Sequence, residues 1–165
     1  MNMKAQLGFT LIELLVALAI VTIVLTAGVP SFVSLVRNND SATEVNGLRS
    51  ALNLARSEAV SRGVEVMIVP ASGGDWTSGW LVGIDLDDDN SFPDAGEPVL
   101  RSFPAVDALT FTGAPARLEY KPTGEVNALA SFTMTPNFCD NDHNRQRVLS
   151  VAMAGYVDLT QQSCP

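Results

Sequence analysis

Histidine and cysteine are scarce in this chain, and their scarcity argues against several kinds of site. His143 is the single histidine of 165 residues and lies in a polar stretch without a nucleophile motif. Cys139 and Cys164 do not form a Cys-x-x-Cys pair, so zinc-ligand spacing is not supported. No glycine-rich phosphate loop follows any predicted strand. The sequence therefore predicts no catalytic residues and no enzyme.

Positive charge is also in short supply. The chain has 10 lysines and arginines against 18 acidic residues, a formal net charge of −8. Residues 64–165 hold 14 acidic and 5 basic residues, so the excess of negative charge lies in this part. Such a surface does not attract nucleic acid or anionic lipid by bulk electrostatics.

The chain does contain one long apolar run, from Phe9 to Val29, in which Glu13 is the only charge. About 20 apolar residues suffice for a helix to cross the hydrocarbon core of a membrane. The run is longer than the apolar part of a secretory signal, and no small-x-small cleavage site follows it. The short polar piece from Met1 to Gly8 carries Lys4, which favours a cytoplasmic N-terminus.

A carboxylate inside this run has two interpretations. Glu13 lies one turn into the apolar segment, where an ionised group costs several kcal/mol unless it is paired or neutralised. It could stay hydrated near the lipid headgroups, or it could be paired with a positive charge.

The stretch Gly8-Phe9-Thr10-Leu11-Ile12-Glu13, with the unbroken apolar helix and Pro30 after it, resembles the class III signal of type IV pilins and type II secretion pseudopilins. The resemblance implies that prepilin peptidase cleaves after Gly8 and that the new N-terminus at Phe9 is methylated. It also implies that Glu13 offers its carboxylate to the N-terminal amine of a neighbouring pilin or pseudopilin subunit.

A second helical pattern follows Pro30, with apolar residues at steps of three and four. That spacing is typical of an amphipathic helix with one face on a core. Pro30 removes a backbone donor and predicts a kink, whereas Gly63, after Arg62, predicts the end of the helix. The apolar positions are Ala42, Val45, Leu48, Leu52, Ala55 and Ala59.

From Val64 onward the pattern alternates with a period of two and is divided by turn residues. Many short strands with frequent turns indicate an antiparallel sheet or a small sandwich. The fold class is therefore α+β: a long N-terminal helix, half transmembrane and half amphipathic, packed on a β-rich antiparallel head, as in pilins. The predicted strands are 64–69 (closed by Pro70), 76–84, 98–103, 109–112, 116–121, 126–129, 131–135, 147–153 and 156–159.

Four segments follow from these patterns. Residues 1–8 are the expected leader peptide, 9–30 the transmembrane and assembly helix, 31–63 the amphipathic helix and 64–165 the head. With the N-terminus in the cytoplasm, everything after residue 30 would lie in the periplasm, where disulfides persist. A bond between Cys139 and Cys164 would close a loop of about 25 residues and contribute roughly 3–4 kcal/mol. The alternatives are two unrelated thiols or metal ligands without partners.

The later motifs extend the resemblance. The helix end Ala55–Gly63 is followed by a strand, by Gly79-Trp80-Leu81-Val82 running into Asp85, and late in the chain by a Gly-aromatic turn between two cysteines. Together these motifs look like the GspH/FimT group of minor pilins and pseudopilins over residues 8–164.

The resemblance implies a minor subunit of a type IV pilus, present at low copy near the filament tip and inserted first in the bacterial inner membrane. The alternatives are a minor pseudopilin of a type II secretion system and a DNA-binding minor pilin for natural transformation. The last resembles FimT-like proteins with arginines in the C-terminal tail. The ten residues after Gly155 contain no lysine or arginine, so DNA is not favoured as a partner.

Three further features have local interpretations. Trp76 and Trp80, four residues apart, are expected to pack in the core or at its edge, with a ligand-stacking surface as the alternative. The run Arg145-Gln146-Arg147 is expected to be the solvated start of a strand, and His143 to be an exposed loop residue.

The acidic loop from Asp85 to Glu97 raises the possibility of a metal site. Asp85, Asp87, Asp89 and Ser91 alternate as do the first ligands of a calcium loop, and Asp94 and Glu97 could add oxygens. Against calcium, the sixth position is Asn90 rather than glycine, and Glu97 lies one place beyond the twelfth position. A solvated connection between two strands is the main interpretation, and weak calcium binding the other; no other cofactor is expected.

Overall fold

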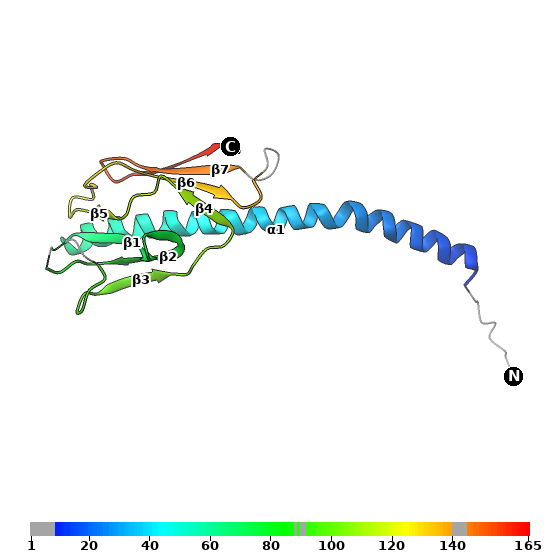
Figure 1. The fold of residues 1–165 in the computed structure, drawn as a ribbon, viewed down its shortest axis with the longest axis horizontal. Coiled ribbons are helices and arrows are strands. Elements are labelled where there is room, and N and C mark those ends of the chain that lie inside the picture. Colours follow the sequence, from blue (N-terminus) through cyan, green and yellow to red (C-terminus); the bar gives the residue numbers. More distant parts are fainter. Residues whose placement is uncertain (1–8, 88, 90–91, 140–144) are drawn as a thin grey trace. The chain divides into compact units, whose positions relative to one another are not determined.

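The protein is described by a computed structural model that covers residues 9–87, 89, 92–139 and 145–165 (Figure 1). Its first element is the helix α1 (Leu11–Arg62), which continues through Pro30. The chain forms two compact units, Met1–Val36 and Arg37–Pro165. We call them the N-terminal unit and the head unit. The head unit contains the second half of α1 and all the strands.

The second half of α1 has the amphipathic character that its sequence predicts. Of the predicted core positions Ala42 is only partly buried, whereas those from Val45 to Ala59 are buried. Leu48, Leu52, Ala55 and Ala59 are fully inaccessible. The helix ends at Arg62, and Gly63 follows with a φ of 70° while its N–H donates to Ala59 O at 2.9 Å. Glycine adopts this left-handed conformation without a side-chain clash, so the predicted helix end is confirmed.

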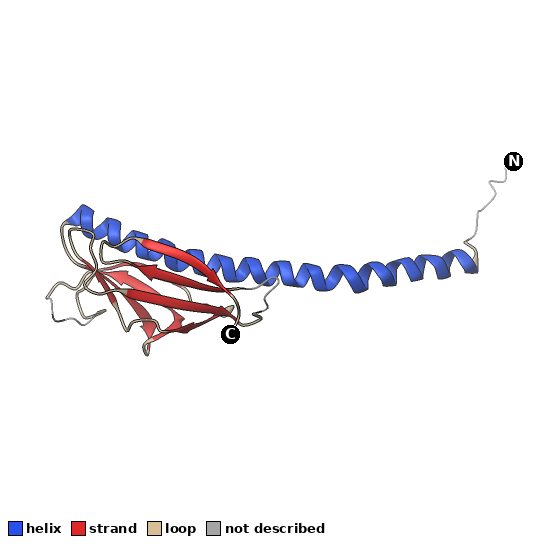
Figure 2. Cartoon of the chain, turned by 90° about the horizontal axis from the view of Figure 1, so that it is seen from above, coloured by secondary structure: helices blue, strands red, loops and turns tan. Residues whose placement is uncertain are grey.

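Two four-stranded antiparallel sheets complete the head unit, and their strands lie along the second half of α1 (Figure 2). One sheet has the order β3-β2-β1-β5 and the other the order β4-β6-β7-β8. The α+β fold class and the antiparallel arrangement are therefore confirmed. The strands are β1 (Val66–Ser72), β2 (Asp75–Gly83), β3 (Val99–Phe103), β4 (Leu109–Thr112), β5 (Leu118–Tyr120), β6 (Ala130–Pro136), β7 (Gln146–Val151) and β8 (Val157–Gln162).

Two strand predictions are wrong. Strand β1 does not close at Pro70 but continues through it to Ser72 with an irregular register. The neighbouring strand β5 pairs only with residues 66–68, so the missing N–H of Pro70 costs no ladder hydrogen bond on that side. The segment 126–129 is not a strand: Val126 forms a single bridge to Tyr120 and donates its N–H to Met153 O at 3.0 Å. The chain crosses there from one sheet toward the other.

Aromatic side chains from both sheets fill one core with α1. Trp80 is 1% exposed and its ring stacks on that of Phe103, with 5.7 Å between ring centroids and 25° between the ring planes. Trp76 packs edge-on against Phe132 at 4.8 Å and donates its indole N–H to Pro115 O at 2.8 Å. Both tryptophans are therefore core residues, and the stacking-surface alternative is wrong.

Candidate functional site

The first functional feature is the start of α1 in the N-terminal unit. Thr10 precedes the helix, and its Oγ1 accepts the N–H of Glu13 at 3.3 Å. A threonine followed three residues later by glutamate has the spacing of a capping box. The carboxylate of Glu13 therefore lies in the first turn, near the positive end of the helix dipole. This position partly offsets the cost of a charge in an apolar segment.

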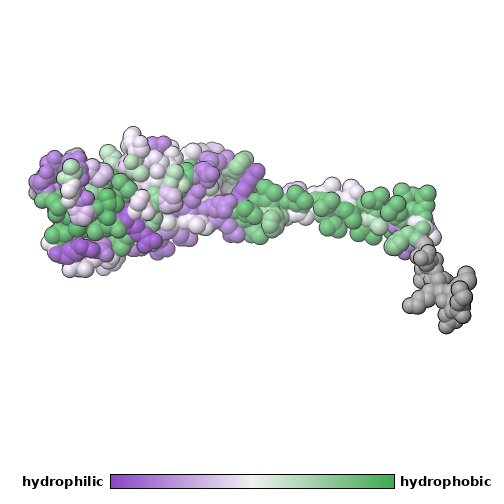
Figure 3. Space-filling model, turned by 90° about the horizontal axis from the view of Figure 1, so that it is seen from below, coloured by the Kyte–Doolittle hydropathy of each residue, from purple (hydrophilic) through white to green (hydrophobic). Residues whose placement is uncertain are grey.

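The side chains that follow form an apolar surface. Among the described residues, α1 is the one helix long and apolar enough to cross a membrane, and none of its apolar window is buried. Figure 3 shows hydrophobic residues over most of this segment, whereas the face of the head unit in view is mixed. The hydroxyls of Thr22 and Ser34 donate to Leu18 O and Pro30 O, at 2.8 and 3.2 Å. They are therefore satisfied within the helix, as lipid requires.

The other predicted residues of this segment have different outcomes. Phe9 is described and 82% exposed, whereas Gly8 lies outside the described residues. The helix is continuous across Pro30, so the kink there stays a prediction, as do cleavage and methylation.

The two cysteines are joined. Cys139 and Cys164 form a disulfide with their Cα atoms 5.7 Å apart, and the predicted pairing is therefore confirmed. The bond ties the segment after β6 to the tail after β8, so that it fixes the C-terminal end of one sheet. His143, between these cysteines in sequence, lies outside the described residues.

The acidic loop brings three carboxylates together. One oxygen each of Asp85, Asp87 and Asp89 lies within 4.8 Å of the others, with Asp85 partly buried. Both oxygens of Glu97 accept backbone N–H groups of the same loop, from Leu86 at 3.0 Å and from Asp94 at 2.9 Å. Glu97 therefore braces the loop, and calcium binding by the three aspartates stays a prediction. Ser91 lies outside the described residues.

We expect calcium, if the loop binds it, to raise the melting temperature of residues 37–165 by several degrees relative to chelator. A cation would offset the repulsion among the three carboxylates. Asp87→Ala should abolish the rise, and the exposed Asp158→Ala should keep it. A melting temperature that stays constant at several millimolar calcium would make the loop a plain surface connection.

The prediction of a solvated strand start at Arg145–Arg147 is half wrong. Arg145 is exposed, but Arg147 is 9% exposed and donates to Asn38 Oδ1 at 3.4 Å and to Arg145 O at 3.3 Å. Loss of solvent lowers the pKa of the Arg147 guanidinium. The side chain points inward because residues 147, 149 and 151 of β7 share the core face of the sheet.

Sequence reasoning missed three polar groups of the head unit. Arg56 donates from α1 to Gly124 O and Ala154 O, both at 3.0 Å. Glu44 accepts through Oε1 the N–H groups of Asp107 and Ala108, both at 3.2 Å. Arg37 places its guanidinium 3.7 Å from the ring centroid of Phe138. All three lie on the polar border of the amphipathic helix, where periodicity gives no sign of a distant partner.

The chain matches two known families. Residues 44–155 match the family described as Type II transport protein GspH, which covers most of the head unit. Residues 3–29 match the Prokaryotic N-terminal methylation motif. No curated protein is significantly similar in sequence.

Three solved structures share the fold. Two crystal structures of the type IV minor pilin FimU from Pseudomonas aeruginosa are 26% and 28% identical, with TM-scores of 0.56 and 0.54. They cover 77% and 74% of this chain, and 99% and 98% of the FimU chain. The minor pseudopilin EpsH from the Type 2 Secretion System of Vibrio cholerae is 15% identical with a TM-score of 0.52. It covers 74% of this chain and 97% of its own, and it supports the fold alone.

Proposed function

The chain belongs to the GspH family of pilin-like proteins, and from that premise we propose that it is a minor structural subunit of a type IV pilus. It would enter the filament at low copy, near the tip, and support pilus assembly. The observation that carries this proposal is the likeness of this chain to FimU. Nearly the whole FimU chain is covered at 26–28% identity, against 15% for the pseudopilin EpsH.

The proposed route to the filament begins in the inner membrane. The exposed apolar half of α1 and the methylation motif at residues 3–29 support a single-pass anchor with the N-terminus in the cytoplasm and the head in the periplasm. Prepilin peptidase would remove residues 1–8 and leave a methylated Phe9. The disulfide between Cys139 and Cys164 is consistent with an oxidising compartment for the head.

Glu13 is the residue that we propose for assembly. An amine from a neighbouring subunit would pair with its carboxylate and neutralise a charge that lipid does not solvate. Capping by Thr10 positions the first turn but uses only the backbone N–H of Glu13, and the acceptor capacity of the carboxylate remains.

The second candidate is a minor pseudopilin of a type II secretion system. The description of the matching family and the fold of EpsH favour it. A third candidate, DNA reception, has less support: residues 64–165 carry 14 acidic against 5 basic residues, and the tail after Gly155 has no base.

The test is to purify surface pili and, separately, the type II secretion complex from the source bacterium. Mass spectrometry should find the chain in the pilus fraction, starting at methylated Phe9. Glu13→Ala should leave membrane insertion intact, because a charge has been removed from lipid, but should reduce incorporation about tenfold. The matched control Glu65→Ala, at a partly buried position outside the apolar run, should keep normal incorporation.

A chain found only with the secretion complex would replace the pilus by the pseudopilus. A chain that assembles with residues 1–8 still attached would contradict the pilin-type route altogether. Unchanged incorporation of Glu13→Ala would reduce Glu13 to a helix-end charge.

A further inference from the structure

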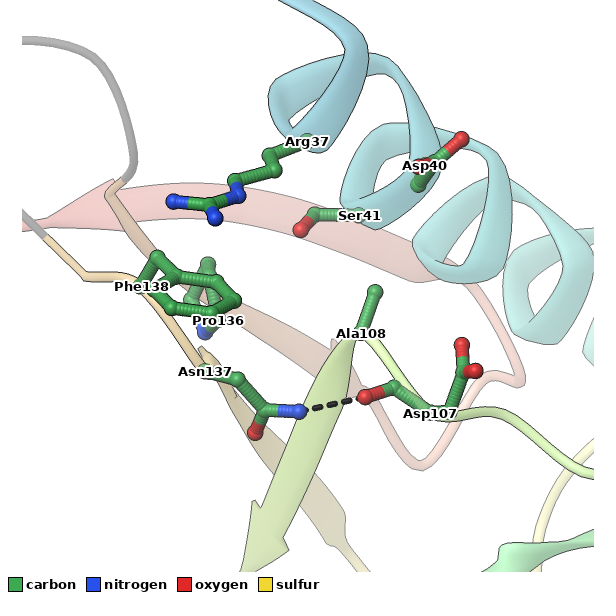
Figure 4. A pocket seen from close by; sticks show the side chains of 8 residues that line it. All are labelled: Arg37, Asp40, Ser41, Asp107, Ala108, Pro136, Asn137 and Phe138. Atoms are coloured by element: carbon green, nitrogen blue, oxygen red, sulfur yellow. Dashed lines mark hydrogen bonds between the residues drawn. The ribbon is translucent and has the colours of Figure 1, made fainter. Parts of the chain in front are cut away.

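A small pocket lined by one basic and two acidic side chains lies beside the first helical turns of the head unit. Its volume is about 200 Å³. Figure 4 shows Arg37 and Phe138 at one side, the carboxylates of Asp40 and Asp107 at the other, and Ser41 between them. The pocket thus has a cation and an aromatic ring on one side and two carboxylates on the other, of which that of Asp107 points toward the helix (Figure 4).

The wall that carries Asp107 is held in place by four hydrogen bonds. Glu44 Oε1 accepts the N–H groups of Asp107 and Ala108, both at 3.2 Å. The N–H of Asn137 donates to Ala108 O at 2.9 Å, and its side-chain amide donates to Asp107 O. The pocket is therefore preorganised by backbone contacts that leave the Asp107 carboxylate available.

The charged groups around the pocket are not neutralised within the described protein. Neither of the two ion pairs found among the described residues includes Arg37, Asp40 or Asp107. Burial raises the pKa of the neighbouring Glu44, and the charges of Asp107 and Asp40 act in the same direction. A cation between these carboxylates would relieve their mutual repulsion, and an anion would satisfy Arg37.

The position of the pocket along the chain indicates where such a ligand would come from. The segment from Phe9 to Val36 contains no charge except Glu13, and its helical part from Leu11 onward is about 39 Å long at about 1.5 Å per residue. A bilayer with its headgroup regions is about 40–45 Å thick. Arg37 is the next residue, so a chain that spans the membrane places it at the level of the outer headgroups.

We infer that this pocket binds the phosphoethanolamine headgroup of a membrane phospholipid while the protein resides in the inner membrane. Arg37 takes the phosphate, and Asp40 and Asp107 take the ammonium group. Phe138 is 57% exposed. In this arrangement its ring would lie at the membrane–water interface, where aromatic residues are enriched in membrane proteins. The inference rests on the membrane-anchored stage of the proposed function but not on the filament that follows.

The chemistry of the pocket distinguishes this headgroup from two common ones. A primary ammonium has three N–H donors for the carboxylates, whereas the trimethylammonium of phosphatidylcholine has none. Phosphatidylglycerol has a phosphate for Arg37 but no cation for Asp40 and Asp107. Its net negative charge would also be repelled by the negatively charged protein. Phosphatidylethanolamine is therefore the lipid that matches both sides.

The experiment uses the full chain in a mild detergent, titrated with phosphatidylethanolamine, phosphatidylglycerol or phosphatidylcholine of equal acyl chains. Native mass spectrometry counts the bound lipids. We expect phosphatidylethanolamine to bind about tenfold more tightly than either competitor, a difference of about 1.4 kcal/mol. Arg37→Gln should weaken all three lipids. Asp40→Asn combined with Asp107→Asn should remove the preference for phosphatidylethanolamine.

Matched controls are Arg49→Gln and Asp158→Asn, which change exposed charges outside the pocket and should keep the preference. Equal binding of the three lipids, or a preference that survives in the pocket variants, would overturn the inference. Free phosphoethanolamine tests the soluble source: if it binds as tightly as the lipid, the lipid assignment is wrong. Lipid binding in detergent requires neither cleavage nor filaments. A chain that keeps its lipid preference but is absent from pili would therefore count against the proposed function alone.

Discussion

Replacing Gly155 by alanine should lower the free energy of unfolding of the head unit by about 3 kcal/mol, measured by denaturant titration. Gly155 has a φ of 77° in the turn between β7 and β8, a conformation that costs an L-residue about 1 kcal/mol. An added Cβ would also overlap Gly124 O, which lies in the turn after β5 of the other sheet. Because a backbone carbonyl cannot move aside as a flexible side chain can, the overlap should separate the two turns.

Gly113→Ala is the matched control for the backbone conformation. Gly113 has a φ of 69°, but nothing lies within 4 Å of the position that its Cβ would occupy. The free energy of unfolding of this variant should therefore fall by only about 1 kcal/mol, the cost of the left-handed conformation. Equal losses at the two positions would mean that the contact between the turns is not tight.

The regular elements of the head could be predicted because each leaves a local trace in the sequence. The period of three and four between Val45 and Ala59 identifies the buried helix face, and Gly63 marks its end. The strand limits around Pro70 were wrong for a non-local reason. Whether proline is tolerated there depends on how far the neighbouring strand β5 extends, which the residues around Pro70 do not encode.

The candidate sites also differ in whether the local sequence reveals them. The segment from Gly8 to Glu13 and the two cysteines are recognisable from spacing or from family resemblance. The pocket beside Arg37 is not, because its residues come from α1, from the loop before β4 and from the end of β6. Arg147 could have been found, because alternation along the predicted strand places it on the same face as the apolar Leu149 and Val151.

Arg56 connects three parts of the head unit that are distant in sequence. From α1 its Nε donates to Gly124 O and its Nη2 to Ala154 O, both at 3.0 Å, and the guanidinium lies 4.3 Å from the ring centroid of Tyr156. Gly124 follows β5 in one sheet, and Ala154 lies between β7 and β8 in the other. One side chain therefore holds both sheets to the helix at the same end of the core.

Arg56→Ala should accordingly lower the free energy of unfolding by about 2–4 kcal/mol. The variant loses two charge-assisted hydrogen bonds and a cation–π contact, and it leaves the carbonyl of the buried Gly124 without its partner. Arg56→Lys should recover less than half of the loss, because a lysine ammonium lacks the planar fork that reaches two carbonyls at once. Denaturant titration of the head unit, with an unchanged slope, measures both differences.

Arg49→Ala is the control from the same helix. Arg49 is exposed and lies two turns before Arg56, so its removal should change stability by less than about 0.5 kcal/mol. In hydrogen exchange, Arg56→Ala should speed the exchange of the backbone amides of Val126 and Gly155 most. These amides donate to Met153 O and Ala152 O, next to the two turns that Arg56 contacts. A loss of stability spread evenly over the head, or full rescue by lysine, would show that Arg56 acts by general packing and not as a connection between the two turns.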